Sequence, residues 1–207
     1  MSKLTIYNDD EERYQLVEEP EARYTYSYAD YLQWKFKEQL ELIKGRIYKL
    51  SAPTTKHQQV TGKIFVSLFN FLDRKTCKAF VSPFDVRLPR KMNASDKEIT
   101  TVVQPDVCVV CDESKLDARG CCGAPDLVVE VLSQGNSAHE VRTKFGLYEE
   151  AGVKEYWLIN TEEENLVTYQ LNAEGRFVGG PMYAAEDIVS STAVHGFTIA
   201  VSNIFKY

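Results

Sequence analysis

The sequence predicts an α/β fold in which a mixed β-sheet is flanked by helices. One long segment has apolar residues every three or four positions, which is typical of a core-facing helix. Downstream of it lie short apolar runs at 102–111, 127–132 and 156–160. Such runs are typical of strands covered on both faces. A second helical segment separates the last two runs, so helices and strands alternate as in a layered α/β protein.

The N-terminal part of the chain predicts a lead-in and a short helix. Residues 1–23 are polar and charged, with little periodicity, and we interpret them as a polar N-terminal lead-in. A single domain is expected to follow over residues 24–207. Ser27 is a good N-cap residue, so it predicts a short helix over 27–34.

A hairpin and a long helix are expected next. Two short strands are expected over 39–43 and 46–50, and Lys44-Gly45 between them is typical of a tight turn. Pro53, Thr54 and Thr55 then open a helix that is expected to end near Lys75. Its core-facing stripe is formed by Val60, Ile64, Leu68, Phe71 and Leu72.

The middle of the chain predicts strands separated by loops. A strand is expected over 80–88, ended by Pro89, and another over 102–111. The charged segment 112–123 predicts a loop before the strand 127–132.

The C-terminal part predicts a helix and several short strands. The helix should end near Ala151, with Asn136 or Ser137 as its N-cap and Gly152 after its last residue. Strands follow it, with turns expected at 172–175 and 179–181.

Composition limits the class of protein and its surroundings. The chain has 207 residues, with 24 Lys and Arg against 30 Asp and Glu, for a net charge of −6. This balance argues against a long, non-specific nucleic-acid footprint, because phosphate contacts come from Lys and Arg. It leaves room for a local basic groove. No secretory signal is visible, and no apolar run approaches the ~20 residues of a membrane span, so we expect a cytoplasmic protein with no membrane partner.

Five cysteines are present: Cys77, Cys108, Cys111, Cys121 and Cys122. An odd number without a secretory signal predicts reduced thiols. A zinc site is disfavoured, because residues three apart in a strand, such as Cys108 and Cys111, point to opposite faces.

Acidic residues beside or within two apolar runs are the main indication of function. Asp106 precedes Val107, and Glu130 lies inside the run 127–132. A carboxylate in such surroundings is costly unless something pairs with it. Two carboxylates on adjacent strands suit Mg²⁺ or Mn²⁺, with the Val131 carbonyl as a third oxygen ligand. Asp126 lies four residues before Glu130, and residues an even number of positions apart in a strand point to the same face. Asp126 is therefore a further candidate ligand, with a role as a turn residue as the alternative.

Residues on the two helices are further candidates. His57 falls in the first turn of the long helix, where backbone N–H groups favour an anion, and it is a candidate for contact with a phosphate or the metal site. A packing or capping role is the alternative. Lys144 lies one turn before Tyr148, so the two share a helix face. Tyr148, Tyr156 and Trp157 are expected to be core residues.

The order of these elements, together with several motifs, resembles one nuclease family over roughly residues 38–204. The motifs are Glu41-Leu42-Ile43-Lys44-Gly45-Arg46, Ser51-Ala52-Pro53 with His57, Asp85-Val86-Arg87-Leu88, Gln104-Pro105-Asp106-Val107, residues 124–133, Lys144, and residues 148–157. In this combination the chain resembles the Uma2 family (DUF820) of endonucleases, within the PD-(D/E)XK superfamily.

The resemblance implies a restriction-endonuclease-like core and a metal-dependent endonuclease. The superfamily has a lysine two residues after Glu130, where this chain has Leu132. The resemblance implies that Lys144 replaces it on the following helix. Lys154, at the start of the strand after that helix, is the alternative candidate. The resemblance also implies that Glu41 joins the metal site, although the alternation of Glu41 with Leu40 and Leu42 is equally compatible with solvent exposure.

Three functions remain open. The first is hydrolysis of phosphodiester bonds in nucleic acid, with DNA as the expected substrate, Asp106, Glu130 and Lys144 as catalytic residues, and a homodimer as a candidate assembly. The second is a nuclease-fold module that binds nucleic acid or a protein without cutting, which the leucine at position 132 favours. The third is a metal-binding hydrolase of small phosphoesters.

Overall fold

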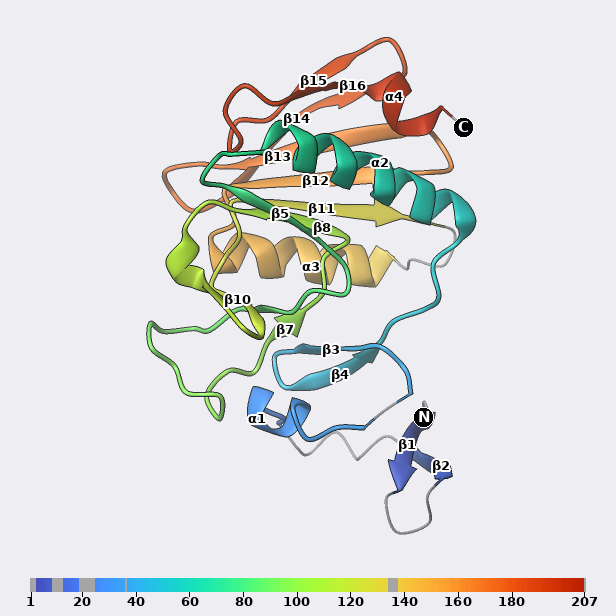
Figure 1. Ribbon diagram of the computed structural model, residues 1–207, viewed down its shortest axis with the longest axis vertical. Coiled ribbons are helices and arrows are strands. Elements are labelled where there is room, and N and C mark those ends of the chain that lie inside the picture. Colours follow the sequence, from blue (N-terminus) through green and yellow to red (C-terminus); the bar gives the residue numbers. More distant parts are fainter. Residues whose placement is uncertain (1–2, 9–12, 19–24, 36, 134–137, 207) are drawn as a thin grey trace. The chain divides into compact units, whose positions relative to one another are not determined.

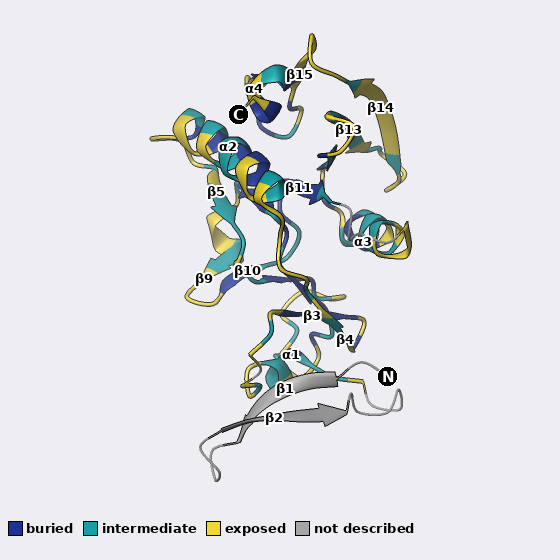
Figure 2. Cartoon of the chain, turned by 90° about the vertical axis from the view of Figure 1, so that its right-hand side faces the viewer, coloured by how far each residue is buried: buried dark blue, intermediate teal, exposed yellow. Residues whose placement is uncertain are grey.

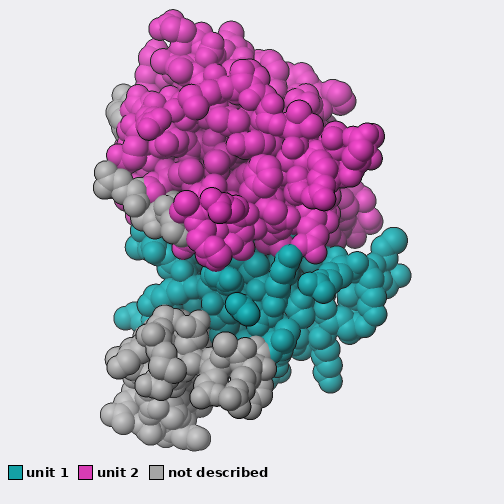
Figure 3. Space-filling model, turned by 180° about the vertical axis from the view of Figure 1, so that it is seen from behind, with its two compact units in different colours: residues 1–52, 87–103 teal, residues 53–86, 104–207 magenta. Residues whose placement is uncertain are grey.

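The computed structural model describes residues 3–8, 13–18, 25–35, 37–133 and 138–206. The chain divides into two compact units. Unit 1 comprises residues 1–52 and 87–103, and unit 2 comprises residues 53–86 and 104–207 (Figure 3). The single domain expected over residues 24–207 stays a prediction.

Unit 1 is built from short strands and one short helix. Its elements are β1 (Lys3–Asn8), β2 (Arg13–Glu18), α1 (Tyr28–Tyr31), β3 (Leu40–Ile43), β4 (Arg46–Lys49) and β7 (Val102–Val103). The antiparallel strands β1 and β2 lie within the segment interpreted as a lead-in, where no strand was expected. Strand β3 pairs with β4 on one side and β7 on the other.

Two local predictions in unit 1 are confirmed. Ser27 caps α1 in a capping box, in which its hydroxyl accepts from the Asp30 N–H and the Asp30 carboxylate accepts from the Ser27 N–H. The β3–β4 hairpin turns at Lys44 and Gly45, whose φ angles are 50° and 78°. Both residues are in the left-handed region that such a two-residue turn requires.

Unit 2 contains a six-stranded mixed sheet of order β14-β13-β12-β11-β8-β5. Its strands are β5 (Lys78–Val81), β8 (Val107–Val110), β11 (Leu127–Leu132), β12 (Glu155–Asn160), β13 (Asn165–Leu171) and β14 (Phe177–Tyr183). Strands β11 and β12 are parallel, and the other neighbouring pairs are antiparallel. The α/β fold with a mixed sheet is therefore confirmed.

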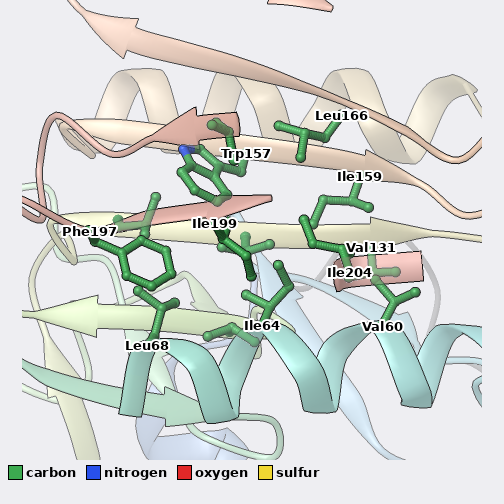
Figure 4. Close-up of a cluster of buried hydrophobic side chains, with 14 of the residues drawn as sticks. Val60, Ile64, Leu68, Val131, Trp157, Ile159, Leu166, Phe197, Ile199 and Ile204 are labelled. Carbon is green, nitrogen blue, oxygen red and sulfur yellow. The ribbon is translucent and has the colours of Figure 1, made fainter. Parts of the chain in front are cut away.

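Two helices lie on opposite sides of β11: α2 (Thr55–Phe71) and α3 (Ala138–Ala151) (Figures 1 and 2). The predicted stripe of α2 is buried at Val60, Ile64, Leu68 and Leu72, and it packs in one core with Trp157 and Ile159 of β12 (Figure 4).

The ends of these helices test two further predictions and leave a third untested. α2 ends at Phe71, one turn earlier than predicted. Gly152 follows α3 with a φ of 84°, as its predicted role after the last helical residue requires. The N-cap expected for α3, at Asn136 or Ser137, lies outside the described residues.

Further short elements complete the fold. They are β6 (Val86–Arg87), the 3₁₀ helix η1 (Glu113–Lys115), β9 (Leu116–Asp117), β10 (Gly120–Cys122), β15 (Ile188–Ser190), β16 (Thr198–Ala200) and α4 (Val201–Phe205). Across the described ranges, no helix has the length and apolarity needed to cross a bilayer.

Three further predictions about the strands were wrong, and each involves a proline. The strand expected over 80–88 is divided into β5 and β6 around a cis Ser82-Pro83 bond. The run 102–111 is divided into β7 and β8 at Gln104-Pro105, because proline has no N–H for a strand ladder. The turn expected at 179–181 is instead part of β14, an edge strand, where Pro181 is tolerated.

The prediction of five reduced thiols was wrong for two of them. Cys77 and Cys111 form a disulfide, with their Cα atoms 3.8 Å apart. The cause is the antiparallel register of β5 and β8, which pairs Lys78 with Val110 and so places residues 77 and 111 opposite each other. Cys108, Cys121 and Cys122 are thiols, as predicted.

A fully buried carboxylate links β12 to the segment before β16. Glu155 accepts hydrogen bonds from Trp157 Nε1 at 2.8 Å, Ser191 Oγ at 2.6 Å, and the backbone N–H groups of Thr192 at 2.9 Å and Ala193 at 2.8 Å. Four donors replace the water that this charge would lose on burial.

Candidate functional site

The register of the unit 2 sheet brings Asp106 and Glu130 to neighbouring strands. In the antiparallel pair of β8 and β11, Val107 is opposite Val129. Asp106 directly precedes Val107 and Glu130 directly follows Val129, so the two residues adjoin the same end of this pairing. Both carboxylates act on the same histidine, His57, so they belong to one local site.

Direct contacts support this arrangement. The Asp106 Oδ2 atom accepts a hydrogen bond from the Val131 N–H at 2.8 Å. The carboxylate of Asp106 is therefore held against the backbone of the residue that follows Glu130. The Val131 carbonyl, the third oxygen predicted for the site, belongs to the same short stretch of β11.

Helix α3 supplies two donors to Glu130. Lys144 Nζ lies 3.0 Å from Glu130 Oε1, and the Tyr148 hydroxyl donates to the same oxygen at 2.6 Å. Both reach it because residues four apart share one face of a helix, and this face of α3 is turned toward the sheet. The expected projection of Lys144 toward Glu130 is thus present, whereas the contact of Tyr148 was not expected.

Helix α2 supplies a histidine to Asp106. The Thr54 hydroxyl caps α2 by accepting from the His57 N–H at 3.2 Å, which fixes His57 in the first turn. Its Nε2 lies 3.2 Å from Asp106 Oδ2, and its Nδ1 lies 3.4 Å from the Thr61 hydroxyl. His57 therefore lies beside one of the two carboxylates.

The charges around His57 raise its pKa above 6.5. Burial by itself would lower this pKa, because it disfavours the charged ring. The hydrogen bond and charge of Asp106, the charge of Glu130 and the Val131 backbone act in the opposite direction and together outweigh burial. His57 and Lys144 thus lie against the carboxylates of Asp106 and Glu130, respectively.

We expect Asp106→Asn to lower the pKa of His57 in the metal-free protein, because the largest favourable contact of the protonated ring is lost. A pH titration of the His57 ring signal by NMR measures this directly. A raised folded-state pKa stabilises the protein fully below the unfolded value of about 6.5, and this contribution disappears as pH rises through the folded value. An unchanged pKa in Asp106→Asn would contradict the pairing of the two side chains.

The remaining candidates lie apart from this cluster or in the other unit. Asp126 precedes β11, and its carboxylate accepts from the Cys111 N–H at 2.7 Å and pairs with Lys154 Nζ at 2.6 Å. These contacts account for Asp126 as a buried structural group and for Lys154 as its partner. Glu41 is buried in β3 of unit 1, and its role in the site stays a prediction.

The atoms of this cluster can be compared with the ligands that a divalent cation prefers. Among the residues that the structure describes, no group of three or more His, Cys, Asp and Glu side chains is arranged to hold a metal ion. Two carboxylates and a backbone carbonyl are instead the hard oxygen donors that suit Mg²⁺, which keeps several waters and takes only one or two carboxylates. The oxygen atoms of the Asp106 and Glu130 carboxylates and of the Val131 carbonyl are therefore suitable ligands for such a cation.

Comparison with known proteins gives the family. The Uma2 family, described as "Putative restriction endonuclease", matches residues 28–202. The chain belongs to this family. The Uma2 match includes His57, Asp106, Glu130, Lys144 and Tyr148. No curated protein matches the chain.

A solved structure supports the fold of this Uma2 protein. It is described as a "putative nuclease belonging to DUF820" from Anabaena variabilis ATCC 29413. The two chains share 17% sequence identity with a TM-score of 0.68, and the match covers 87% of this chain and 97% of the other. At this identity the likeness concerns the fold.

Sequence reasoning missed two contacts of the Uma2 site. Tyr148 was expected to be a core residue, which its burial confirms, but its hydrogen bond to Glu130 was not anticipated. His57 was a candidate for the metal site, but Asp106 was not named as its partner. The signal for Tyr148 was available: it lies four residues after Lys144 on one helix face. The partner of His57 could not be read, because α2 and β8 are far apart in the sequence.

Proposed function

We propose that this Uma2 protein is a metal-dependent endonuclease that hydrolyses phosphodiester bonds of nucleic acid. The observation that carries the proposal is the cluster of Asp106 and Glu130 on neighbouring strands, with Lys144 at 3.0 Å from Glu130. Membership of a family described as "Putative restriction endonuclease" supports the reaction class.

Each residue of the cluster has a role in this proposal. Asp106, Glu130 and the Val131 carbonyl would hold Mg²⁺ or Mn²⁺. Such a cation lowers the pKa of water and neutralises charge on the scissile phosphate. Lys144 stabilises the negative charge that develops in the transition state, as a cation beside the reacting group. His57, positively charged below its raised pKa, contributes a phosphate contact at the start of α2.

The proposal includes DNA as the substrate and a two-fold dimer as the working assembly. A two-fold axis gives one copy of the site to each strand of a duplex. The assembly can be measured by light scattering with and without duplex DNA.

One further function is favoured by a specific feature. Leu132 occupies the position of the superfamily lysine, and this substitution favours a module that binds nucleic acid or a protein without cutting. In that case the Lys144–Glu130 pair would serve only to neutralise a buried carboxylate.

A cleavage assay separates these functions. Supercoiled DNA, linear duplex, single-stranded DNA and RNA are incubated with the protein and Mg²⁺ or Mn²⁺, with a chelator as the control. We expect cleavage of nucleic acid that the chelator abolishes, and none of a small phosphoester. Binding without cleavage of any nucleic acid would support the inactive module, and turnover of the small phosphoester alone would support the third function.

The metal ligands are tested by calorimetry with Mn²⁺. We expect wild type to bind Mn²⁺ and the double variant Asp106→Asn, Glu130→Gln to lose this binding, because it loses both carboxylates. Glu174→Gln, which removes an exposed carboxylate from the turn between β13 and β14, is the matched control and should bind as wild type does. Unchanged affinity in the double variant would place the metal elsewhere.

A further inference from the structure

The buried hydroxyl of Tyr148 is a second donor at Glu130 and has no role in the proposed reaction. It donates to Glu130 Oε1 at 2.6 Å, the same oxygen that Lys144 contacts at 3.0 Å. A core residue at this place needs only a ring, and phenylalanine would supply one. The hydroxyl therefore requires its own explanation.

The environment of Tyr148 fixes where its hydroxyl lies. The Tyr148 side chain is fully buried, and its ring lies 5.4 Å from that of Tyr156 on β12. Tyr156 in turn contacts Phe145, Tyr169 and Phe177 in one aromatic cluster. A rigid ring held by packing on several sides places its hydroxyl in one position, because only two side-chain torsions define it.

The two donors at Glu130 differ in rigidity. The lysine side chain is a flexible chain of four carbons, and the side chain of Lys144 is 17% exposed to solvent. Tyr148 is fully enclosed. The rigid donor is the one that can set the orientation of the carboxylate, whereas the flexible donor can remain available for charge stabilisation.

We infer that Tyr148 is a positioning residue that orients the Glu130 carboxylate for cation binding. The inference rests on the proposed function, since it requires Glu130 to be a metal ligand. Groups that hydrogen-bond to metal ligands commonly affect metal affinity by about 10- to 100-fold when they are replaced.

The experiment compares Mn²⁺ affinity in wild type, Tyr148→Phe and Tyr169→Phe by calorimetry. We expect Tyr148→Phe to bind Mn²⁺ about 10- to 100-fold more weakly. Tyr169→Phe removes a hydroxyl from the same aromatic cluster and should bind as wild type does. Equal affinity for wild type and Tyr148→Phe, or an equal loss in both variants, would overturn the inference.

A rescue variant separates the hydroxyl from the packing of the ring. Introduction of 4-aminophenylalanine at position 148 restores a donor at the same end of the ring, whereas 4-methylphenylalanine fills the space without one. We expect the amino variant to recover Mn²⁺ affinity and the methyl variant to remain weak. This pair also serves if the phenylalanine variant does not fold. Equal affinity of the two variants would assign the effect to packing and overturn the inference.

The outcome for wild type distinguishes this inference from the proposed function. If wild type itself binds no Mn²⁺, the proposed metal site fails, and the inference fails with it. If wild type binds Mn²⁺ through Asp106 and Glu130 while Tyr148→Phe binds it equally well, only the inference fails.

Discussion

Lys144→Ala is expected to slow cleavage of nucleic acid by about 100- to 1000-fold, the range typical for loss of one electrostatic stabiliser of a transition state. The ammonium group of Lys144 lies 3.0 Å from Glu130 Oε1, so its removal takes a positive charge away from the candidate site. Mn²⁺ binding and folding should persist, because the lysine is not a ligand and Tyr148 still contacts Glu130. Single-turnover cleavage rates at saturating Mn²⁺ measure the effect.

Lys154→Ala is the matched control for this variant. It also removes a lysine from a lysine–carboxylate pair in unit 2, but its partner is Asp126, which directly precedes β11 and has no contact with Lys144 among those the structure shows. We expect full cleavage activity in Lys154→Ala. Wild-type activity in Lys144→Ala, or a selective loss in Lys154→Ala, would show that Lys144 does not replace the lysine missing at position 132.

Glu155→Ala is expected to lower the free energy of unfolding by about 3–5 kcal/mol. The variant leaves four donors without their acceptor, namely those of Trp157, Ser191, Thr192 and Ala193. Hydrogen bonds to charged groups contribute about 1.5–3 kcal/mol each, and neighbouring losses are not additive. Chemical denaturation followed by tryptophan fluorescence and circular dichroism measures the change.

An exposed glutamate provides the comparison for this stability effect. Glu174→Gln should leave the free energy of unfolding nearly unchanged, because its side chain lies at the surface. A loss below about 1 kcal/mol in Glu155→Ala would mean that water satisfies the exposed donors and that the network contributes little.

Much of the fold could be predicted because its signals are local. The stripe of α2, the capping of α1 by Ser27 and the turn at Lys44 and Gly45 each depend on residues within a few positions of one another. The strand β11 could be predicted from its apolar run, which only Glu130 interrupts. The breaks at Pro83 and Pro105 were missed, because apolar runs on both sides of each proline were read as one strand.

The sequence by itself determined which residues were candidates for the site: Asp106 and Glu130, which are costly beside apolar strands, and His57 and Lys144 on two predicted helices. Only the tertiary structure decided the partners of these residues. The register of β8 and β11 sets Asp106 beside Val131, and the packing of α2 and α3 brings His57 to Asp106 and Tyr148 to Glu130. The register of β5 and β8 likewise joined Cys77 to Cys111. Such pairings depend on how distant segments align, and a periodic pattern within one segment carries no information about that alignment.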